Sequence, residues 1–194
     1  MKLSEKRMLQ KKEQILLSAI KIVNKYGFEQ ATMEQISAAL YMTKGALYYY
    51  FKNKQDLLFQ CHHFVLSKAL VHLRDIASRN DSAEIVLADL VDAHINYVIE
   101  EREFFNLLLD PNKAFDEAQL QPVLELRKQY ATVFDEVIER GIKEGVFHVE
   151  QPFIVRMAIL GAMNWIQQWY KSQGTLTKSD IQMHYQQLIL KLLK

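Results

Sequence analysis

Apolar residues recur at intervals of three and four along most of the chain, which is the period of an α-helix. The first clear stripe, formed by Ile15, Ala19, Ile22 and Tyr26, predicts a helix over about 10–26 that ends at Gly27. Further stripes predict helices over about 33–40, 44–51, 55–79, 82–101, 120–144, 152–170 and 177–194, and a short apolar segment over 104–109. No segment shows the alternation of apolar and polar residues that is typical of a strand. We therefore expect an all-α fold of about nine helices.

Residue types that favour helix ends support these boundaries. Side chains that can cap a helix precede four of the predicted helices, namely Thr32, Thr43, Asn53 and Thr177. Proline suits the first turn of a helix, so Pro122 and Pro152 predict two further starts. Residues 1–12 carry five basic side chains and few apolar ones, which predicts a frayed basic arm before the first helix.

The stretch over 43–54 has a surface that a helix covering only a core would not need. Leu47 and Phe51 lie four apart, so they share one helical face that can pack inward. The opposite face carries two small residues and a tyrosine, namely Gly45, Ala46 and Tyr49. Small residues allow close approach to a groove, and tyrosines supply flat contact area and hydroxyl groups for phosphate oxygens. With Lys44 at one end and Lys54 at the other, the stretch predicts a helix that reads DNA.

The preceding residues complete a helix-turn-helix pattern. Thr32 and Gln35 have the spacing of a capping box at the start of the helix over 33–40. Tyr41 and Met42 then form a tight turn before Thr43. Two helices joined by a short turn are the arrangement of a helix-turn-helix DNA reader, so we expect double-stranded DNA as a partner.

At these residues the sequence resembles the tetracycline-repressor (TetR) family of bacterial transcription regulators. The resemblance runs from Ile15 to Leu58, and it is carried by Ala19, Gly27-Phe28, Ala31-Thr32-Met33, Ile36-Ser37 and the unbroken run from Thr43 to Leu58. The family usually has glycine in the turn, where this chain has Tyr41. A tyrosine in a left-handed conformation costs roughly 1–2 kcal/mol, so we expect a wider or strained turn.

We expect DNA contacts from individual residues, and for Lys54 the resemblance itself implies a phosphate contact. Five residues are expected to hold phosphates: Thr32, Thr43, Tyr48, Tyr49 and Lys54. Four are expected to face or approach base edges: Lys44, Gly45, Ala46 and Tyr50. We also expect a homodimer that represses transcription at a palindromic operator and is released by a small apolar effector. In the family, release works by tilting the long helix over 55–79.

The charge distribution agrees with a basic DNA-binding end. Residues 1–54 hold ten Lys/Arg and four Asp/Glu, a net charge of +6, whereas residues 55–194 hold fourteen and nineteen, a net charge of −5. We therefore expect a DNA-binding domain over 1–54 and an effector-binding and dimerisation domain over 55–194. The single cysteine, the lack of a secretory signal and the lack of a long apolar run predict a cytoplasmic protein that does not enter a membrane.

The last two predicted helices carry more apolar side chains than one small bundle is expected to bury. Their stripes predict a dimer interface made of Ile159, Met163, Ile166, Ile181, Tyr185, Leu188 and Leu192. A four-helix contact between two copies would bury them. It would also place two recognition helices about 34–36 Å apart, or a multiple of that distance.

No arrangement of residues predicts catalysis, a metal site or a cofactor. The neighbours His62 and His63 point to different sides of a helix, and the other histidines are scattered, so we expect ordinary surface or core histidines. Cys61 lies on an apolar stripe, and a small buried side chain is favoured over a redox sensor. We therefore expect a protein that is not an enzyme.

The segment 161–170 suggests the effector site. Trp165 and Trp169 lie four apart, and Asn164 is the one polar residue after a long apolar run. These residues predict the wall of a pocket for an apolar ligand, or alternatively aromatic packing at the dimer interface. The segment also resembles the branch of the family that responds to fatty acyl-CoA thioesters. Weaker candidates for the same cavity are Phe104, Phe105, Arg127 and Tyr130.

Two other functions remain open from the sequence. A constitutive or architectural DNA-binding protein would have a core filled by its own side chains. A helical protein that binds small molecules, with a basic end that no longer reads DNA, would fail to bind any genomic fragment.

Overall fold

The computed structural model describes residues 3–106 and 115–194, and within these residues the chain is entirely helical apart from turns and loops. The helices are α1 (Leu3–Tyr26), α2 (Met33–Ala39), α3 (Lys44–Tyr48), α4 (Lys54–Ala77), α5 (Ala83–Glu100), α6 (Arg102–Asn106), α8 (Glu117–Lys143), α9 (Pro152–Trp169) and α10 (Lys178–Leu193). The predicted all-α fold is confirmed. The predicted segment 104–109 lies partly outside the described residues, and its first part belongs to α6.

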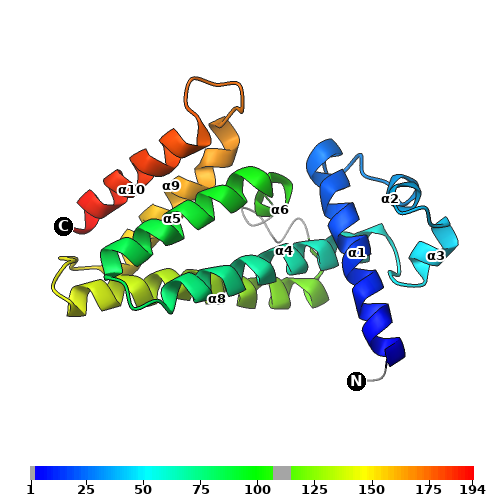
Figure 1. Cartoon of the computed structure of the whole chain (residues 1–194), viewed down its shortest axis with the longest axis horizontal. Helices are drawn as coiled ribbons and strands as arrows, with labels where there is room; N and C mark the ends of the chain where they lie inside the picture. The colour runs from blue at the N-terminus through cyan, green and yellow to red at the C-terminus, as the bar shows by residue number, and fades with distance from the viewer. Residues whose placement is uncertain (1–2, 107–114) are drawn as a thin grey trace.

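The helices form a small unit and a larger bundle that share α4 (Figure 1). Helices α1, α2 and α3 lie at one end, and α4 leads from them along α8. Helix α4 packs against α1 on the side of the small unit and against α5 and α8 in the bundle. Helices α9 and α10 pack on the other side of α5.

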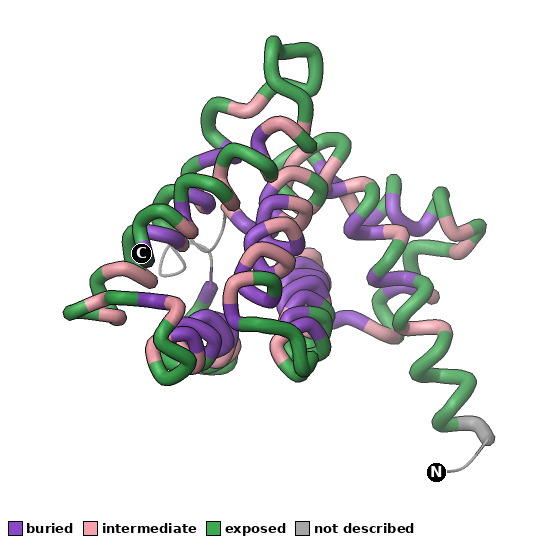
Figure 2. The backbone as a smooth tube through the Cα atoms, turned by 60° about the vertical axis from the view of Figure 1, so that its left-hand side comes forward, coloured by how far each residue is buried: buried purple, intermediate pink, exposed green. Residues whose placement is uncertain are grey.

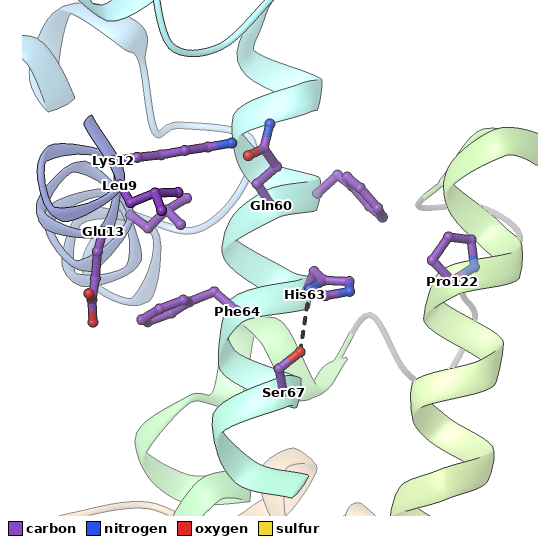
Figure 3. Close-up of a pocket in the computed structure, with 10 residues that line it drawn as sticks. Leu9, Lys12, Glu13, Gln60, His63, Phe64, Ser67 and Pro122 are labelled. Carbon is purple, nitrogen blue, oxygen red and sulfur yellow. Dashed lines mark hydrogen bonds between the residues drawn. The ribbon is translucent and has the colours of Figure 1, made fainter. Parts of the chain in front are cut away.

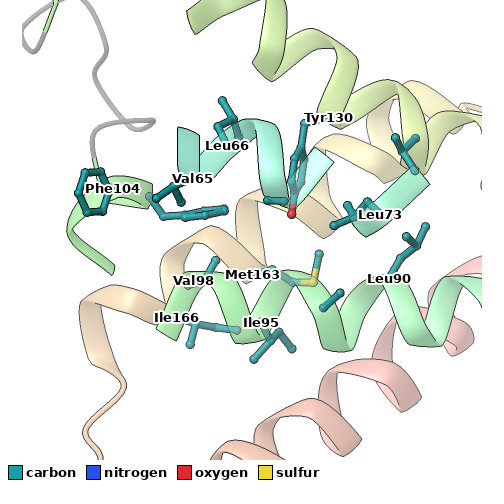
Figure 4. Close-up of a cluster of buried hydrophobic side chains, with 14 of the residues drawn as sticks. Val65, Leu66, Leu73, Leu90, Ile95, Val98, Phe104, Tyr130, Met163 and Ile166 are labelled. Carbon is teal, nitrogen blue, oxygen red and sulfur yellow. The ribbon is translucent and has the colours of Figure 1, made fainter. Parts of the chain in front are cut away.

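Buried residues lie along the facing sides of the bundle helices, whereas residues 5–10 of α1 are exposed (Figure 2). The buried residues make one continuous core that runs from Ile15 in α1 to Leu193 in α10. Inside the bundle, Leu66 and Leu73 of α4 belong to the same buried cluster as Leu90 and Val98 of α5 (Figure 4). The small unit and the bundle therefore share one core.

Two predicted starts are wrong, each for a local physical reason. Helix α1 begins at Leu3, so the basic segment is helical and not a frayed arm. Lys, Arg, Glu, Gln, Leu and Met are good helix formers, and extending an existing helix costs little once a nucleus exists. Helix α8 begins at Glu117, and Pro122 lies inside it. The start is fixed by an Asp116–Gln119 capping box, in which the Gln119 N–H donates to Asp116 Oδ1 over 2.9 Å.

Most predicted caps are present. Thr32 and Thr177 each form a capping box, Asn53 Oδ1 accepts from the Asp56 N–H over 2.8 Å, and Pro152 opens α9. These signals act within a few residues, so tertiary packing does not overrule them.

The turn after α2 is strained, as the departure at Tyr41 predicts. Tyr41 has φ 53°, and its side chain is 99% exposed. The Tyr41 N–H donates to Ala38 O over 3.1 Å, and the Met42 N–H donates to Ser37 O over 2.9 Å. These two bonds define a Schellman motif, the helix end that favours glycine in the left-handed position. Gly145 occupies the equivalent position after α8, with φ 74°.

The core also contains two buried histidines, His62 of α4 and His94 of α5. Burial lowers the pKa of each imidazole to about 4, because a charged ring would lose its hydration. The expected core histidines are thus present, and both are neutral at pH 7.

We expect Tyr41→Gly to raise the free energy of unfolding by about 1 kcal/mol, because glycine adopts a positive φ without a Cβ clash. Urea unfolding followed by circular dichroism measures the change. Tyr41→Ala is the matched control, since it removes the same exposed ring and keeps the strained backbone. A Tyr41→Gly protein no more stable than Tyr41→Ala would show that the turn stores no strain.

The buried histidines predict that stability falls as the pH is lowered from 7 to 5. In this range the unfolded chain takes up a proton on each histidine, whereas the folded chain does so only near pH 4. Each histidine should therefore cost about 2 kcal/mol of unfolding free energy between these pH values. The His94→Gln variant, referenced to its own stability at pH 7, should lose about half of this pH dependence. An unchanged pH dependence would mean that His94 titrates equally in both states.

Candidate nucleic-acid interface and ligand pocket

Helices α2 and α3 form the predicted helix-turn-helix. The Gln35 N–H donates to Thr32 Oγ1 over 3.1 Å, and the Ala46 N–H donates to Thr43 Oγ1 over 3.1 Å, so both helices begin at hydroxyl caps. Leu47 and Phe51 are buried and hold α3 against the core of the small unit. The packed face of α3 is therefore the one that the sequence predicts.

The opposite face of α3 points to solvent. Tyr49 is 77% exposed, and Lys44, Gly45 and Tyr48 are exposed beside it. Thr43 is exposed, and Thr32 and Ala46 are partly exposed. The exposed tyrosine rings leave apolar surface in contact with water, which is unfavourable. A partner that covers this face would remove that surface from water.

Tyr50 lies differently from the other tyrosines. It is partly buried against the core, and its ring meets the Tyr49 ring edge-on at 5.1 Å between centroids. It therefore supports Tyr49 from behind in the free protein. Its partly exposed side chain remains accessible to a base edge.

Two lysines expected at the DNA have partners in the free protein. Lys44 forms an exposed ion pair with Glu34 of α2. Lys54 Nζ donates to Glu29 O over 3.0 Å, which joins the start of α4 to the loop after α1. Exposed pairs of this kind contribute at most about 1 kcal/mol, so a phosphate can replace either partner.

A cavity of about 200 Å³ lies in the bundle among α4, α5, α6, α8 and α9. It is lined by Leu66, His94, Phe105, Arg127, Tyr130, Ala131, Arg156, Met157, Leu160, Gly161 and Asn164. Four of these residues were predicted to bind a ligand: Phe105, Arg127, Tyr130 and Asn164. The lining is mostly apolar with a few converging polar groups, which is typical of a small-molecule site.

Three predicted pocket residues do not line this cavity. Phe104 is buried one position away from Phe105, and its ring packs edge-on against Phe28 at 5.2 Å between centroids. Trp165 is 61% exposed, and Trp169 is also exposed on the outer side of α9. Helix α9 turns its Ile159–Ile166 side inward, which places the two tryptophans outside.

His94 and Arg156 line the cavity and were not predicted as site residues. His94 Nδ1 lies 2.9 Å from the Tyr130 hydroxyl, and burial raises the pKa of Tyr130 well above its usual value. Arg156 Nε donates to Asp135 Oδ1 over 2.9 Å. A signal for His94 exists in the sequence, because it is the polar residue on the apolar stripe between Leu90 and Val98.

A wider groove of about 760 Å³ lies where α1, α4 and α8 meet (Figure 3). Leu9 and Lys12 of α1 face Gln60 and Phe64 of α4, and Pro122 of α8 lies across from them. His63 Nδ1 and Ser67 Oγ, 3.3 Å apart, are hydrogen-bonded to each other within α4. This groove is more open to solvent than the cavity in the bundle, so the cavity, which can surround more of a ligand, is the better ligand site.

Direct contacts join the small unit to the part of the bundle beside the cavity. Asn24 Nδ2 donates to Glu101 Oε2 over 2.7 Å, next to the Phe28–Phe104 contact. The Cys61 thiol lies 3.8 Å from Leu16 O, and burial raises its pKa. A thiol of this kind is a poor redox sensor, in agreement with the expected buried role.

The predicted dimer interface is partly wrong. Ile159, Met163, Ile166 and Ile181 are buried within the chain, and Figure 4 shows Met163 and Ile166 beside Ile95 and Val98 of α5. They cannot also cover a second copy, because α5 already covers them. Tyr185 is partly buried and donates to Ala162 O over 3.2 Å, whereas Leu188 and Leu192 are exposed.

The exposed sides of α9 and α10 carry other large apolar side chains. They are Phe153, Ile154, Met157, Trp165 and Trp169 of α9, and Met183, Leu188 and Leu192 of α10. We call these eight residues the α9–α10 apolar face.

No group of three or more His, Cys, Asp or Glu side chains among residues 3–106 and 115–194 could hold a metal ion. None of the described helices is long and apolar enough to cross a membrane.

Comparison with known proteins shows the family. Residues 80–193, more than half of the chain, match the family described as "Tetracyclin repressor-like, C-terminal domain". Residues 15–61 match "Bacterial regulatory proteins, tetR family". The "Fatty acid metabolism regulator protein" of Bacillus subtilis is 22% identical over 148 residues, which cover 75% of this chain and 74% of that protein. Two further Bacillus subtilis relatives are covered over only 37% and 35% of their lengths.

Solved structures show the same fold. A TetR/AcrR-family regulator from Thermobifida fusca YX-ER1 superposes with a TM-score of 0.82 at 21% identity, covering 95% of this chain and 99% of that one. AibR, solved with isovaleryl coenzyme A and operator DNA, gives a TM-score of 0.71 at 20% identity, covering 94% and 97%. The family matches confirm the prediction of a regulator and not an enzyme. The chain therefore belongs to the TetR family of bacterial transcriptional regulators.

Proposed function

We propose that the protein is a cytoplasmic transcriptional repressor that binds a palindromic operator as a homodimer and is released by a small effector. Residues 1–54 would be the DNA-binding domain, and residues 55–194 would bind the effector and form the dimer. The observation that carries the proposal is the outward face of α3. Lys44, Tyr48 and Tyr49 are exposed there, while Leu47 on the other side holds the helix in place.

The positions of the side chains support the proposed DNA contacts. Base edges would be approached by Lys44, Gly45, Ala46 and Tyr50, and phosphates would be held by Thr32, Thr43, Tyr48, Tyr49 and Lys54. A lysine can donate to guanine O6 and N7, which contributes about 1–3 kcal/mol of discrimination. To make this contact, Lys44 would have to break its ion pair with Glu34.

The α9–α10 apolar face supports dimerisation. Large exposed apolar patches on a soluble surface mark interaction sites. Two copies packed through this face would bury it in a four-helix contact, with the two-fold symmetry that a palindromic operator requires. Of the dimer residues predicted from the sequence, Leu188 and Leu192 belong to this face. The buried residues do not, and Trp165 and the other exposed residues of the face take their place.

Helix α6 contacts both the cavity and the DNA-binding end, so a ligand in the cavity could change the position of that end through α6. Phe105 lines the cavity, and the adjacent Phe104 packs on Phe28 of the small unit. A ligand that displaces α6 would therefore also displace this contact and helix α1, which packs against both α6 and α4. Release requires a higher ligand affinity for the state that fits DNA poorly.

The relatives supply one effector class. The Bacillus subtilis relative is named for fatty acid metabolism, and the AibR structure holds isovaleryl coenzyme A. An acyl-CoA thioester is accordingly one effector to be tested for this chain.

Selection of bound fragments from genomic DNA tests the proposal as a whole. The selected fragments should share a palindrome whose half-sites lie about one duplex turn apart, or a multiple of it. Failure to bind any fragment would overturn the proposal. Bound fragments that no small molecule releases would favour a constitutive DNA-binding protein.

The roles of Tyr49 and Lys54 differ in their salt dependence. Tyr49→Ala should weaken operator binding by at least about tenfold without changing the slope of affinity against salt, because no charge is lost. Lys54→Ala should lower that slope by about one. Fluorescence anisotropy with a labelled operator measures both. Tyr26→Ala, a change of the same type at the far end of α1, should bind normally, and equal binding by Tyr49→Ala would remove α3 from the interface.

The proposed dimer face predicts that Leu188→Glu gives a monomer, because a carboxylate would be buried among apolar side chains. Light scattering after size exclusion measures the mass. Val71→Glu, at an exposed valine on α4, is the matched control and should remain dimeric. A dimeric Leu188→Glu protein would place the interface elsewhere.

A further inference from the structure

Two polar side chains of the cavity lack partners among the described residues. His94 lacks a hydrogen-bond partner for one ring nitrogen, and Arg127 lacks a negatively charged partner. His94 is 2% exposed, and its Nε2 atom has no hydrogen-bond partner in the part of the chain that the structure describes. The Asn164 amide approaches the ring, but no bond of normal geometry reaches Nε2. A buried nitrogen left in this state costs about 1–3 kcal/mol, which a ligand atom can recover.

The proton on His94 can be assigned from its neighbour. The Tyr130 hydroxyl has one hydrogen-bond partner within the described ranges, His94 Nδ1 at 2.9 Å. If Tyr130 donates this bond, its O–H group and His94 Nδ1 are both satisfied. Nδ1 then carries no proton, so the proton of the neutral imidazole lies on Nε2. His94 then presents an N–H donor to the cavity, so the ligand atom that meets it is an acceptor oxygen.

Arg127 adds a positive charge to the same cavity. It is partly buried, and it forms no ion pair or hydrogen bond with any described residue. Burial lowers the pKa of its guanidinium, because the charged form loses hydration. Arg156, the other arginine of the lining, is already paired with Asp135. Among the described residues, the unpaired charge at the cavity is therefore that of Arg127.

The cavity is small, about 200 Å³, and its polar and apolar lining residues lie close together. A ligand that contacts both Arg127 and the apolar side chains of Leu66, Phe105 and Leu160 therefore needs a short distance between its charged group and its apolar part. The acyl group and the phosphates of a CoA thioester are separated by a long linker, so one such molecule could not place both here.

We propose that the effector is a small organic carboxylate with a short aliphatic or aromatic tail. Its carboxylate accepts a hydrogen bond from His94 Nε2, and Arg127 balances its charge. The Asn164 amide lies beside the same oxygen atoms, and the tail packs on Phe105 and Leu160. This inference rests on the proposed effector role of the cavity and narrows it to one chemical class.

Isothermal titration calorimetry on the full chain tests the ligand class without DNA. The probes are hexanoate and benzoate, their neutral amides hexanamide and benzamide, hexadecanoate, and the CoA thioesters of hexanoic and hexadecanoic acid. We expect hexanoate or benzoate to bind at least about tenfold more tightly than the matching amide, because only the acid carries a charge for Arg127. Equal binding of acid and amide, no binding of either short acid, or tighter binding of hexadecanoate would overturn the inference.

Arg127→Gln should abolish the preference for the acid over the amide. Lys128→Gln is the matched control, since it removes the same charge from the neighbouring exposed position and should keep the preference. His94→Gln should weaken binding of the acid and the amide alike, because both offer a carbonyl oxygen. If Arg127→Gln does not fold, the comparison of acid and amide on the unchanged protein decides the outcome.

Anisotropy with a labelled operator separates this inference from the proposed function. If a CoA thioester releases the protein from the operator and no short acid binds, the inferred carboxylate ligand is wrong and the proposed repressor function stands. Binding of a short acid by a protein that recognises no genomic fragment would support the carboxylate site and overturn the repressor.

Discussion

Burial of apolar side chains on both sides of α4 joins the DNA-reading end of the chain to the bundle. Near its start, Cys61 packs against α1, with its thiol 3.8 Å from Leu16 O. Further along, Leu66 and Leu73 are buried among the bundle helices. Replacing one such leucine by alanine typically costs about 2–5 kcal/mol, so neither contact can be given up cheaply. A change in the bundle is therefore expected to shift α4 as a unit, and the reading helix with it.

The ligand cavity places a few polar groups inside this apolar core. Burial keeps His94 and Tyr130 neutral, and their mutual hydrogen bond satisfies one polar atom of each. Arg127 remains charged without a carboxylate beside it in the described structure. Such an arrangement is costly for an empty protein and favourable for a bound anion, which is the usual relation between stability and a binding site.

The two proposed interaction surfaces differ from the cavity. The cavity buries polar groups in the core, whereas these surfaces leave apolar side chains exposed to water. Tyr48 and Tyr49 are exposed on α3, and a row of larger apolar side chains is exposed on α9 and α10. Neither surface contributes to the fold of the single chain. Each becomes useful when a groove of DNA or a second copy covers it.

Local signals in the sequence determined much of the fold and of the DNA-reading surface. The caps at Thr32, Thr43, Asn53 and Thr177, and the inward pair Leu47 and Phe51, are predicted and present, because each depends on residues within one or two helical turns. The start of α8 was missed, although the capping box at Asp116 is a local signal too. The α1 start was missed because exposed helical turns carry no apolar stripe.

Only the tertiary structure decided which side of α9 faces inward and which polar residues meet in the cavity. Helix α9 is apolar on two sides, so its periodicity alone could not separate Met163, which is buried, from Trp165, which is exposed. His94 and Tyr130 lie 36 residues apart, and Asn164 comes from a third helix. Their meeting depends on how distant helices pack. The identity of single residues constrains hydrogen bonds within a turn, whereas contacts between helices depend on the shapes of all the surfaces that meet.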